Sequence, residues 1–99
     1  MTGSTKQIAW AEDIKRDIIS TVNSMVDHAH KVAGMLEQIN DSIESLEGYS
    51  VAAMETVRDM IVANLDQITY AGDMINIRNN FTAANIQQLA KQVTNGQAI

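Results

Sequence analysis

Residues 8–46 read IAWAEDIKRDIISTVNSMVDHAHKVAGMLEQINDSIESL. Apolar side chains recur in this stretch at gaps of three or four residues, and from Ile18 onward the gaps alternate strictly between four and three. That spacing is typical of the a and d positions of an amphipathic helix with a mean period of 3.5 residues. The apolar positions, which we call the seam, are Ile8, Ala11, Ile14, Ile18, Val22, Met25, Ala29, Val32, Leu36, Ile39, Ile43 and Leu46.

The seam predicts a long first helix over residues 5–47. Ser4 and the glutamine three residues later match a capping box at its start, and residues 1–4 are expected to form a disordered leader. A continuous helix of this length would extend about 63 Å at 1.5 Å per residue, which is long for a small monomer. Two alternatives therefore stay open: the helix is continuous, or it breaks near Asn40, where Asp41 could cap a new helix.

The second half of the chain predicts two further helices. Gly48 and Ser50 are typical of a helix end followed by a helix start, and they open a second long helix over residues 50–78. A short C-terminal helix is expected over residues 82–94. The fold class is therefore all-α: one domain in which an antiparallel hairpin of two long helices is joined by a short third helix, as in a three- to four-helix bundle. Because a domain of 99 residues buries little apolar surface, we also expect a homo-oligomer.

Composition and charge argue against several classes of partner. The net charge is −5, whereas nonspecific nucleic-acid binding and adhesion to anionic membranes both need a basic surface. The chain has no cysteine, which excludes disulfides and thiolate metal sites. It shows neither a signal-peptide pattern nor a run of about 18 apolar residues. We therefore expect a cytoplasmic protein that binds neither nucleic acid directly nor membranes.

No pattern in the sequence predicts catalysis. His28 and His30 are the only histidines, and on a helix their spacing turns them away from each other, so they do not share a metal ion. The sequence lacks a nucleophile elbow and a glycine-rich phosphate loop. We expect a protein that is not an enzyme and that uses no metal and no cofactor.

Acidic residues are concentrated in the middle of the chain, where residues 32–57 include no lysine or arginine. On a continuous helix, Glu37, Asp41 and Glu44 would lie in a stripe on one face. Together with Glu47 they are the candidate site for a partner with a basic surface, which they would attract electrostatically. Carboxylates in such a row could imitate a nucleic-acid backbone.

Four other residues are candidates for a ligand site or an interface: Trp10, Tyr70, Arg78 and Asn79. Trp10 is the only tryptophan, and we expect its large ring in the core or in an interface. Arg78 and Asn79 belong to a polar cluster at the expected end of the second long helix. With Tyr70 they could line a pocket that sequesters a small nucleotide between subunits.

Residues 2–15, TGSTKQIAWAEDIK, resemble the opening of small proteins carried by phages and mobile elements of Gram-positive bacteria, which commonly read T-G-S-E-K-Q-I-x-W-A-E-x-I. A later segment of that group reads A-x-W-W-I-D-N-R. Its counterpart here, residues 71–78, keeps the isoleucine and the arginine but lacks both tryptophans and the aspartate.

Some short acidic proteins from such elements resemble inhibitors of host defence, including anti-CRISPR proteins. The resemblance implies a phage or mobile-element context in the cytoplasm of the bacterial host cell. Together with the acidic stripe, this context leads us to expect a non-enzymatic interaction protein that binds and inhibits a host protein with a basic surface, such as a CRISPR nuclease. Two alternatives stay open. One is a structural coiled-coil homo-oligomer with no foreign target, and the other is the module that sequesters a small nucleotide.

Overall fold

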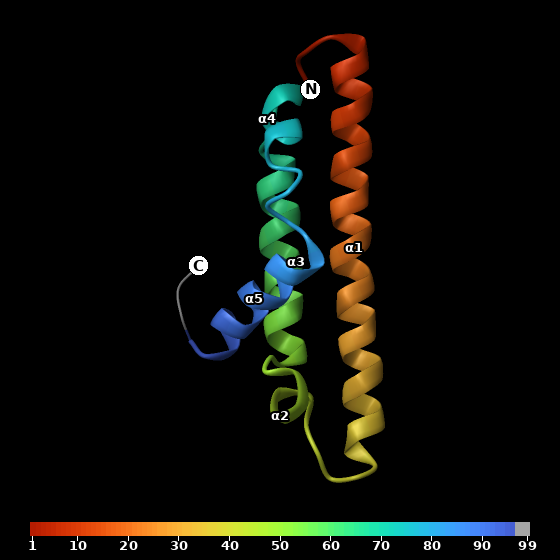
Figure 1. Cartoon of the computed structure of the whole chain (residues 1–99), viewed down its shortest axis with the longest axis vertical. Helices are drawn as coiled ribbons and strands as arrows, with labels where there is room; N and C mark the ends of the chain where they lie inside the picture. The colour runs from red at the N-terminus through yellow and green to blue at the C-terminus, as the bar shows by residue number, and fades with distance from the viewer. Residues whose placement is uncertain (97–99) are drawn as a thin grey trace.

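The computed structural model describes residues 1–96, which fold into helices without a strand (Figure 1). The molecule is elongated, with extents of 53 × 25 × 17 Å. The helices are α1 (Thr5–Glu37), α2 (Ile43–Glu47), α3 (Val51–Asp66), α4 (Ala71–Asn76) and α5 (Ala83–Thr94). The all-helical character and the long first helix agree with the sequence-based prediction.

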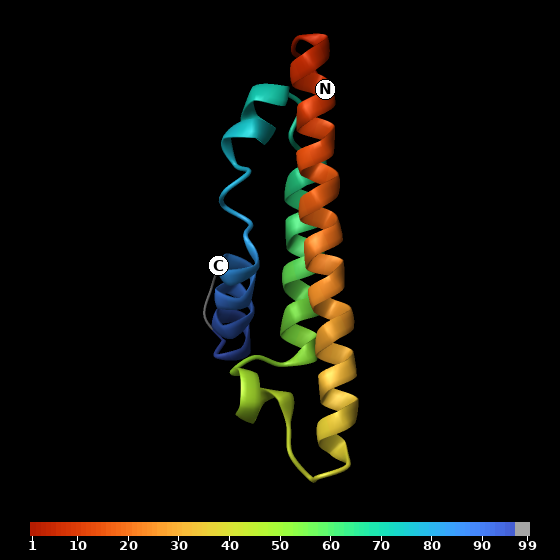
Figure 2. The same cartoon turned by 45° about the vertical axis from the view of Figure 1, so that its right-hand side comes forward.

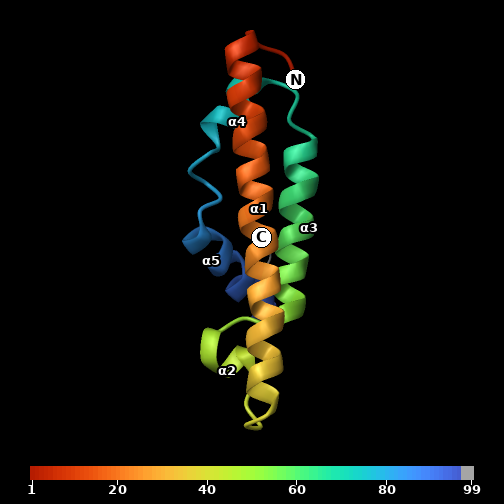
Figure 3. The same ribbon diagram turned by 90° about the vertical axis from the view of Figure 1, so that its right-hand side faces the viewer.

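Helices α1 and α3 lie side by side and run in opposite directions (Figure 1). Lys15 Nζ lies 2.8 Å from Asp66 Oδ1, and His30 Nε2 lies 2.9 Å from Glu55 Oε1, so residue numbers rise along one helix as they fall along the other. The segment that includes α4 and α5 runs along one face of this pair (Figures 2 and 3). There α4 packs against α1 and α5 packs against α3, so the apolar face of α1 is covered within one chain.

The first helix breaks near Asn40, and the alternative of a continuous helix over residues 5–47 is wrong. Helix α1 ends at Glu37, and Asn40 has a φ angle of 55°, in the left-handed region that asparagine tolerates better than most residues. Ser42, not Asp41, caps α2, because the Ser42 side chain accepts a hydrogen bond from the backbone three residues later. Asp41 Oδ1 instead accepts a hydrogen bond of 2.8 Å from the Ser42 backbone N–H.

The second long helix predicted over residues 50–78 is also wrong, because the chain leaves the helical conformation between Asp66 and Ala71. At this point the backbone pairs with the N-terminal segment. The Thr2 N–H donates to the Thr69 carbonyl at 2.7 Å, and the Ala71 N–H donates to the Thr2 carbonyl at 2.8 Å. Because these backbone groups have hydrogen-bond partners outside a helix, the helical conformation can be interrupted here. After the interruption, α4 packs against α1.

Residues 2–4 make specific contacts with the rest of the chain, so this part of the segment 1–4 is not the disordered leader that we expected. Besides the pairing of Thr2, the predicted capping box is present: Ser4 Oγ accepts from the Gln7 N–H at 3.2 Å, and the Ser4 N–H donates to Gln7 Oε1 at 3.1 Å. Gly3 has a φ angle of 149°, and a Cβ atom there would lie 3.0 Å from Ala71 Cβ. Glycine therefore permits the close approach of the N-terminal segment to α4.

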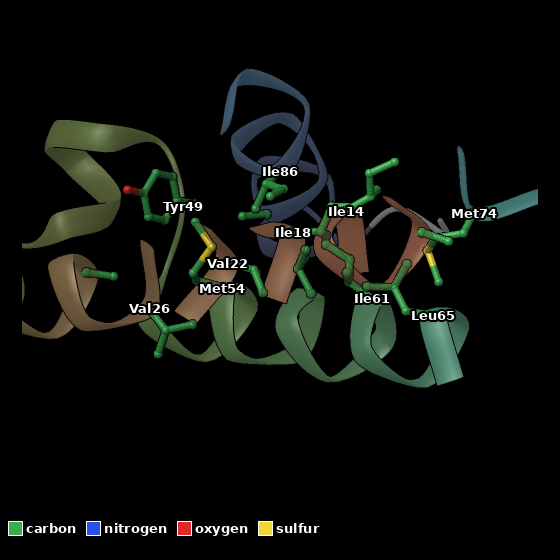
Figure 4. Close-up of a cluster of buried hydrophobic side chains, with 14 of the residues drawn as sticks. Ile14, Ile18, Val22, Val26, Tyr49, Met54, Ile61, Leu65, Met74 and Ile86 are labelled. Atoms are coloured by element: carbon green, nitrogen blue, oxygen red, sulfur yellow. The ribbon is translucent and has the colours of Figure 1, made fainter. Parts of the chain in front are cut away.

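The core lies between the α1–α3 pair and the segment that includes α4 and α5 (Figure 4). The seam is buried from Ala11 to Ala29 with one change: Val26 is 4% exposed, and Met25, the seam residue, is only half-buried. A straight helix has 3.6 residues per turn, so positions that repeat every 3.5 residues drift gradually around its surface. At this point of α1 the side chain that faces the core is therefore Val26 and not Met25. The largest fully buried side chains are Tyr49, Met54, Leu65, Met74, Ile86, Val22 and Val57.

Candidate functional site

The chain reverses direction at the end of α1, and residues 35–47, which we call the tip, form that end of the molecule (Figures 1 and 2). The tip carries all four acidic candidates. Glu37 ends α1, Asp41 lies in the turn, and Glu44 and Glu47 belong to α2. The prediction of an acidic stripe on one helical face is therefore wrong, because the break distributes these residues over three segments. Glu47 is half-buried and the other three are exposed.

Large apolar side chains are exposed in the same segment. Met35 is 61% exposed, Ile39 is 69% exposed and Leu46 is 59% exposed. Ile43 differs from them, because it is 5% exposed and packs in the core, where it holds α2 in place. Exposed apolar surface rimmed by polar groups is typical of a protein-binding surface.

The carboxylates of the tip have no basic neighbours in sequence, since residues 32–57 include no lysine or arginine. Within residues 1–96, no ion pair includes Glu37, Asp41, Glu44 or Glu47. The negative charge of the tip is therefore not compensated by ion pairs in the described part of the chain. Such a surface attracts a positively charged partner over several ångströms.

Two of the four other candidates meet at the opposite end of the molecule. The guanidinium carbon of Arg78 lies 5.4 Å from the centroid of the Trp10 ring, a distance typical of a cation–π interaction. Trp10 is 50% exposed, so it does not lie in the core, and the alternative of a place in an interface stays a prediction. Tyr70 is 60% exposed at the start of α4. The carbonyl of Asn79 accepts a hydrogen bond from the Asn85 side chain at 3.4 Å.

A pocket that the sequence did not reveal lies between the middle of α1, the loop before α3, and α5. It has a volume of about 330 Å³ and is lined by Ser20, Thr21, Ser24, Met25, His28, Tyr49 and Gln87. None of Tyr70, Arg78 and Asn79 lines it, so it is not the nucleotide pocket that we expected from those residues.

One signal in the sequence could have indicated part of this pocket. Ser20, Ser24 and His28 follow at intervals of four, which makes a polar edge beside the seam on α1. Tyr49 and Gln87 come from distant parts of the chain, so their position depends on the packing of α5 and of the loop before α3.

The two histidines occupy different surroundings, and neither belongs to a metal-binding cluster within residues 1–96. His28 lines the pocket, whereas His30 pairs with Glu55 across the α1–α3 interface. Within the same residues, every helix is too short or too polar to cross a lipid bilayer.

Comparisons with protein-family models, with curated proteins and with solved structures gave no match. The resemblance of residues 2–15 to phage proteins stays a prediction.

Proposed function

We propose that this protein is a non-enzymatic interaction protein that binds a basic surface of a host protein through its tip and thereby inhibits that protein. One observation carries the proposal: the tip presents three large, exposed apolar side chains among four carboxylates, with no lysine or arginine from residue 32 to residue 57. This combination gives a binding surface both an apolar anchor and a charge that selects its partner.

The two components of the tip have separate physical roles. Burial of Met35, Ile39 and Leu46 against a partner would supply most of the affinity, because apolar contacts at the centre of an interface dominate its energy. The carboxylates would raise the association rate with a basic partner and disfavour acidic partners. Proteins that hold nucleic acid expose basic grooves, so the resemblance to anti-defence proteins makes an RNA-guided nuclease in the bacterial cytoplasm the most concrete target.

A charge-reversal experiment tests the proposal. The triple variant Glu37→Lys, Asp41→Lys and Glu44→Lys is compared with the native protein for binding to a panel of purified RNA-guided nucleases and for inhibition of their DNA cleavage. We expect the native protein to inhibit at least one nuclease and the variant to lose that inhibition. If no nuclease is bound or inhibited, the proposed target class is wrong.

A matched control separates a local effect from an effect of net charge. Glu12, Asp17 and Asp27 are exposed residues of α1 outside the tip, and no ion pair in the described part of the chain includes them. Their reversal to lysine changes the net charge by the same amount. Equal loss of inhibition in both triple variants would show that the tip is not the contact.

Self-association through the tip is a second candidate, favoured by the exposure of Ile39 and Leu46. Symmetric pairing would place the four carboxylates of each copy close to those of the other copy, which costs free energy in an interface of low dielectric constant. We therefore expect pairing only at high salt, where charge repulsion is screened. Light scattering at increasing salt tests this: a stable dimer at low salt that Ile39→Asp dissociates would favour the structural homo-oligomer.

A further inference from the structure

The buried Tyr49 side chain belongs to the lining of the pocket between α1 and α5. The side chain is 2% exposed, and Figure 4 shows its oxygen pointing away from the other core residues. Within residues 1–96, every fully buried polar side-chain atom has a hydrogen-bond partner. No side-chain hydrogen bond of the Tyr49 hydroxyl is found among these residues. Tyr49 thus contributes a phenol to the residues that line the pocket.

Tyr49 is a hydrogen-bond donor at neutral pH. Burial raises the pKa of its phenol above the ordinary value of 10.0, and the nearby Glu47 carboxylate raises it further. The same carboxylate repels a ligand with negative charge that approaches Tyr49.

The other lining groups are uncharged hydrogen-bonding groups and one thioether, apart from the imidazole of His28. The hydroxyls of Ser20, Thr21 and Ser24 can both donate and accept, and the carboxamide of Gln87 presents a donor and an acceptor side by side. A glutamine carboxamide pairs in this way with the edge of a nucleobase such as adenine. The Met25 sulfur provides a polarizable surface on which a flat ring packs well.

We propose that this pocket binds an uncharged nucleobase or nucleoside. Its volume of about 330 Å³ lies at the lower end of the range of small-molecule sites, which suits a ligand of this size. Within residues 1–96, no lysine or arginine lines the pocket, so it offers a phosphate group no permanently charged partner. The proposal is thus distinct from the nucleotide site predicted around Arg78, and it does not depend on the proposed role of the tip.

The experiment is a titration of the isotopically labelled protein, followed by nuclear magnetic resonance, with adenosine, adenosine monophosphate and glucose as separate probes. We expect adenosine to give saturable shifts at Ser24, His28 and Gln87, with weaker binding of the monophosphate and none of glucose. Tighter binding of the monophosphate, saturable binding of glucose at these residues, or no saturable shift with adenosine up to millimolar concentration would each overturn the proposal.

Two variants and one control assign the contacts. Tyr49→Phe keeps the buried ring and removes only the hydroxyl, and Gln87→Leu removes the carboxamide. Each should weaken adenosine binding by up to about tenfold, as expected for the loss of one hydrogen bond. Gln88→Leu makes the same change at an exposed neighbour that does not line the pocket, and it should leave binding unchanged. Equal affinity of Tyr49→Phe, Gln87→Leu and the native protein would overturn the assignment of this pocket.

Discussion

The guanidinium carbon of Arg78 lies 5.4 Å from the centroid of the Trp10 ring and joins the segment after α4 to the first turns of α1. Both side chains are exposed, so the interaction is expected to contribute about 0.5–1 kcal/mol. Arg78→Met should reduce the free energy of unfolding by that amount and change the fluorescence emission of Trp10, which is the only tryptophan. Urea denaturation and emission spectra measure the two effects. Arg16→Met is the control, and an identical spectral change in that variant would contradict the contact.

The two leucines Leu65 and Leu46 give a matched test of the core. Leu65 is fully buried, whereas Leu46 is 59% exposed although the sequence places it on the seam. Leu65→Ala should reduce the free energy of unfolding by about 2–5 kcal/mol, because it leaves a cavity. Leu46→Ala should change it by about 0.5 kcal/mol or less, as is usual for surface positions. Equal losses in urea denaturation would show that the tip is buried in solution.

Substitution of Asn40 tests the break after α1, and here the sign of the effect is decisive. At a φ angle of 55°, alanine costs about 1–2 kcal/mol more than in a right-handed conformation, so Asn40→Ala should destabilise the protein. In a continuous helix the same substitution would stabilise it, because alanine has the highest helix propensity. Gln38→Ala, at a position with right-handed helical angles, is the control and should have little effect. Thermal or urea denaturation distinguishes the two outcomes.

The raised pKa of Tyr49 predicts a loss of stability at alkaline pH. The folded state holds the phenol proton more tightly than the unfolded state, because burial and then Glu47 disfavour the phenolate. The stabilisation is therefore fully present below the unfolded pKa near 10 and is lost as the pH rises through the higher folded pKa. Urea denaturation between pH 8 and pH 11 should show this decline, and Tyr49→Phe should remove the part due to this residue. An unchanged decline in that variant would assign it to other groups.

The elements that could be predicted from the sequence are those governed by local chemistry. The capping box at Ser4, the serine cap at Ser50 and the threonine cap at Thr82 each depend on a side chain that bonds a backbone N–H three residues away. The helix end at Gly48 depends on a φ angle of 82°, which glycine adopts without strain. Such signals involve residues within one helical turn of each other, so they can be recognised in the sequence.

The candidate sites could be predicted from the sequence only in part. The four carboxylates of the tip could be picked out by charge, but their arrangement could not, because it depends on the break at Asn40. The pairing of Trp10 with Arg78, and the meeting of Tyr49 and Gln87 at one pocket, join residues far apart in the chain. Contacts between such distant residues cannot be predicted from the periodicity of a helix.

The helical character of the chain, the starts of most helices and the apolar face of α1 can all be predicted from the sequence. Those properties follow from propensity, capping and periodicity, which act over a few residues. Three other features depend on the packing of the whole chain: Thr2 pairs beside Tyr70 where the second helix is interrupted, Val26 and not Met25 enters the core, and the seam is exposed at Ile39 and Leu46. They follow from tertiary contacts because the burial of a side chain depends on which surfaces the rest of the chain covers.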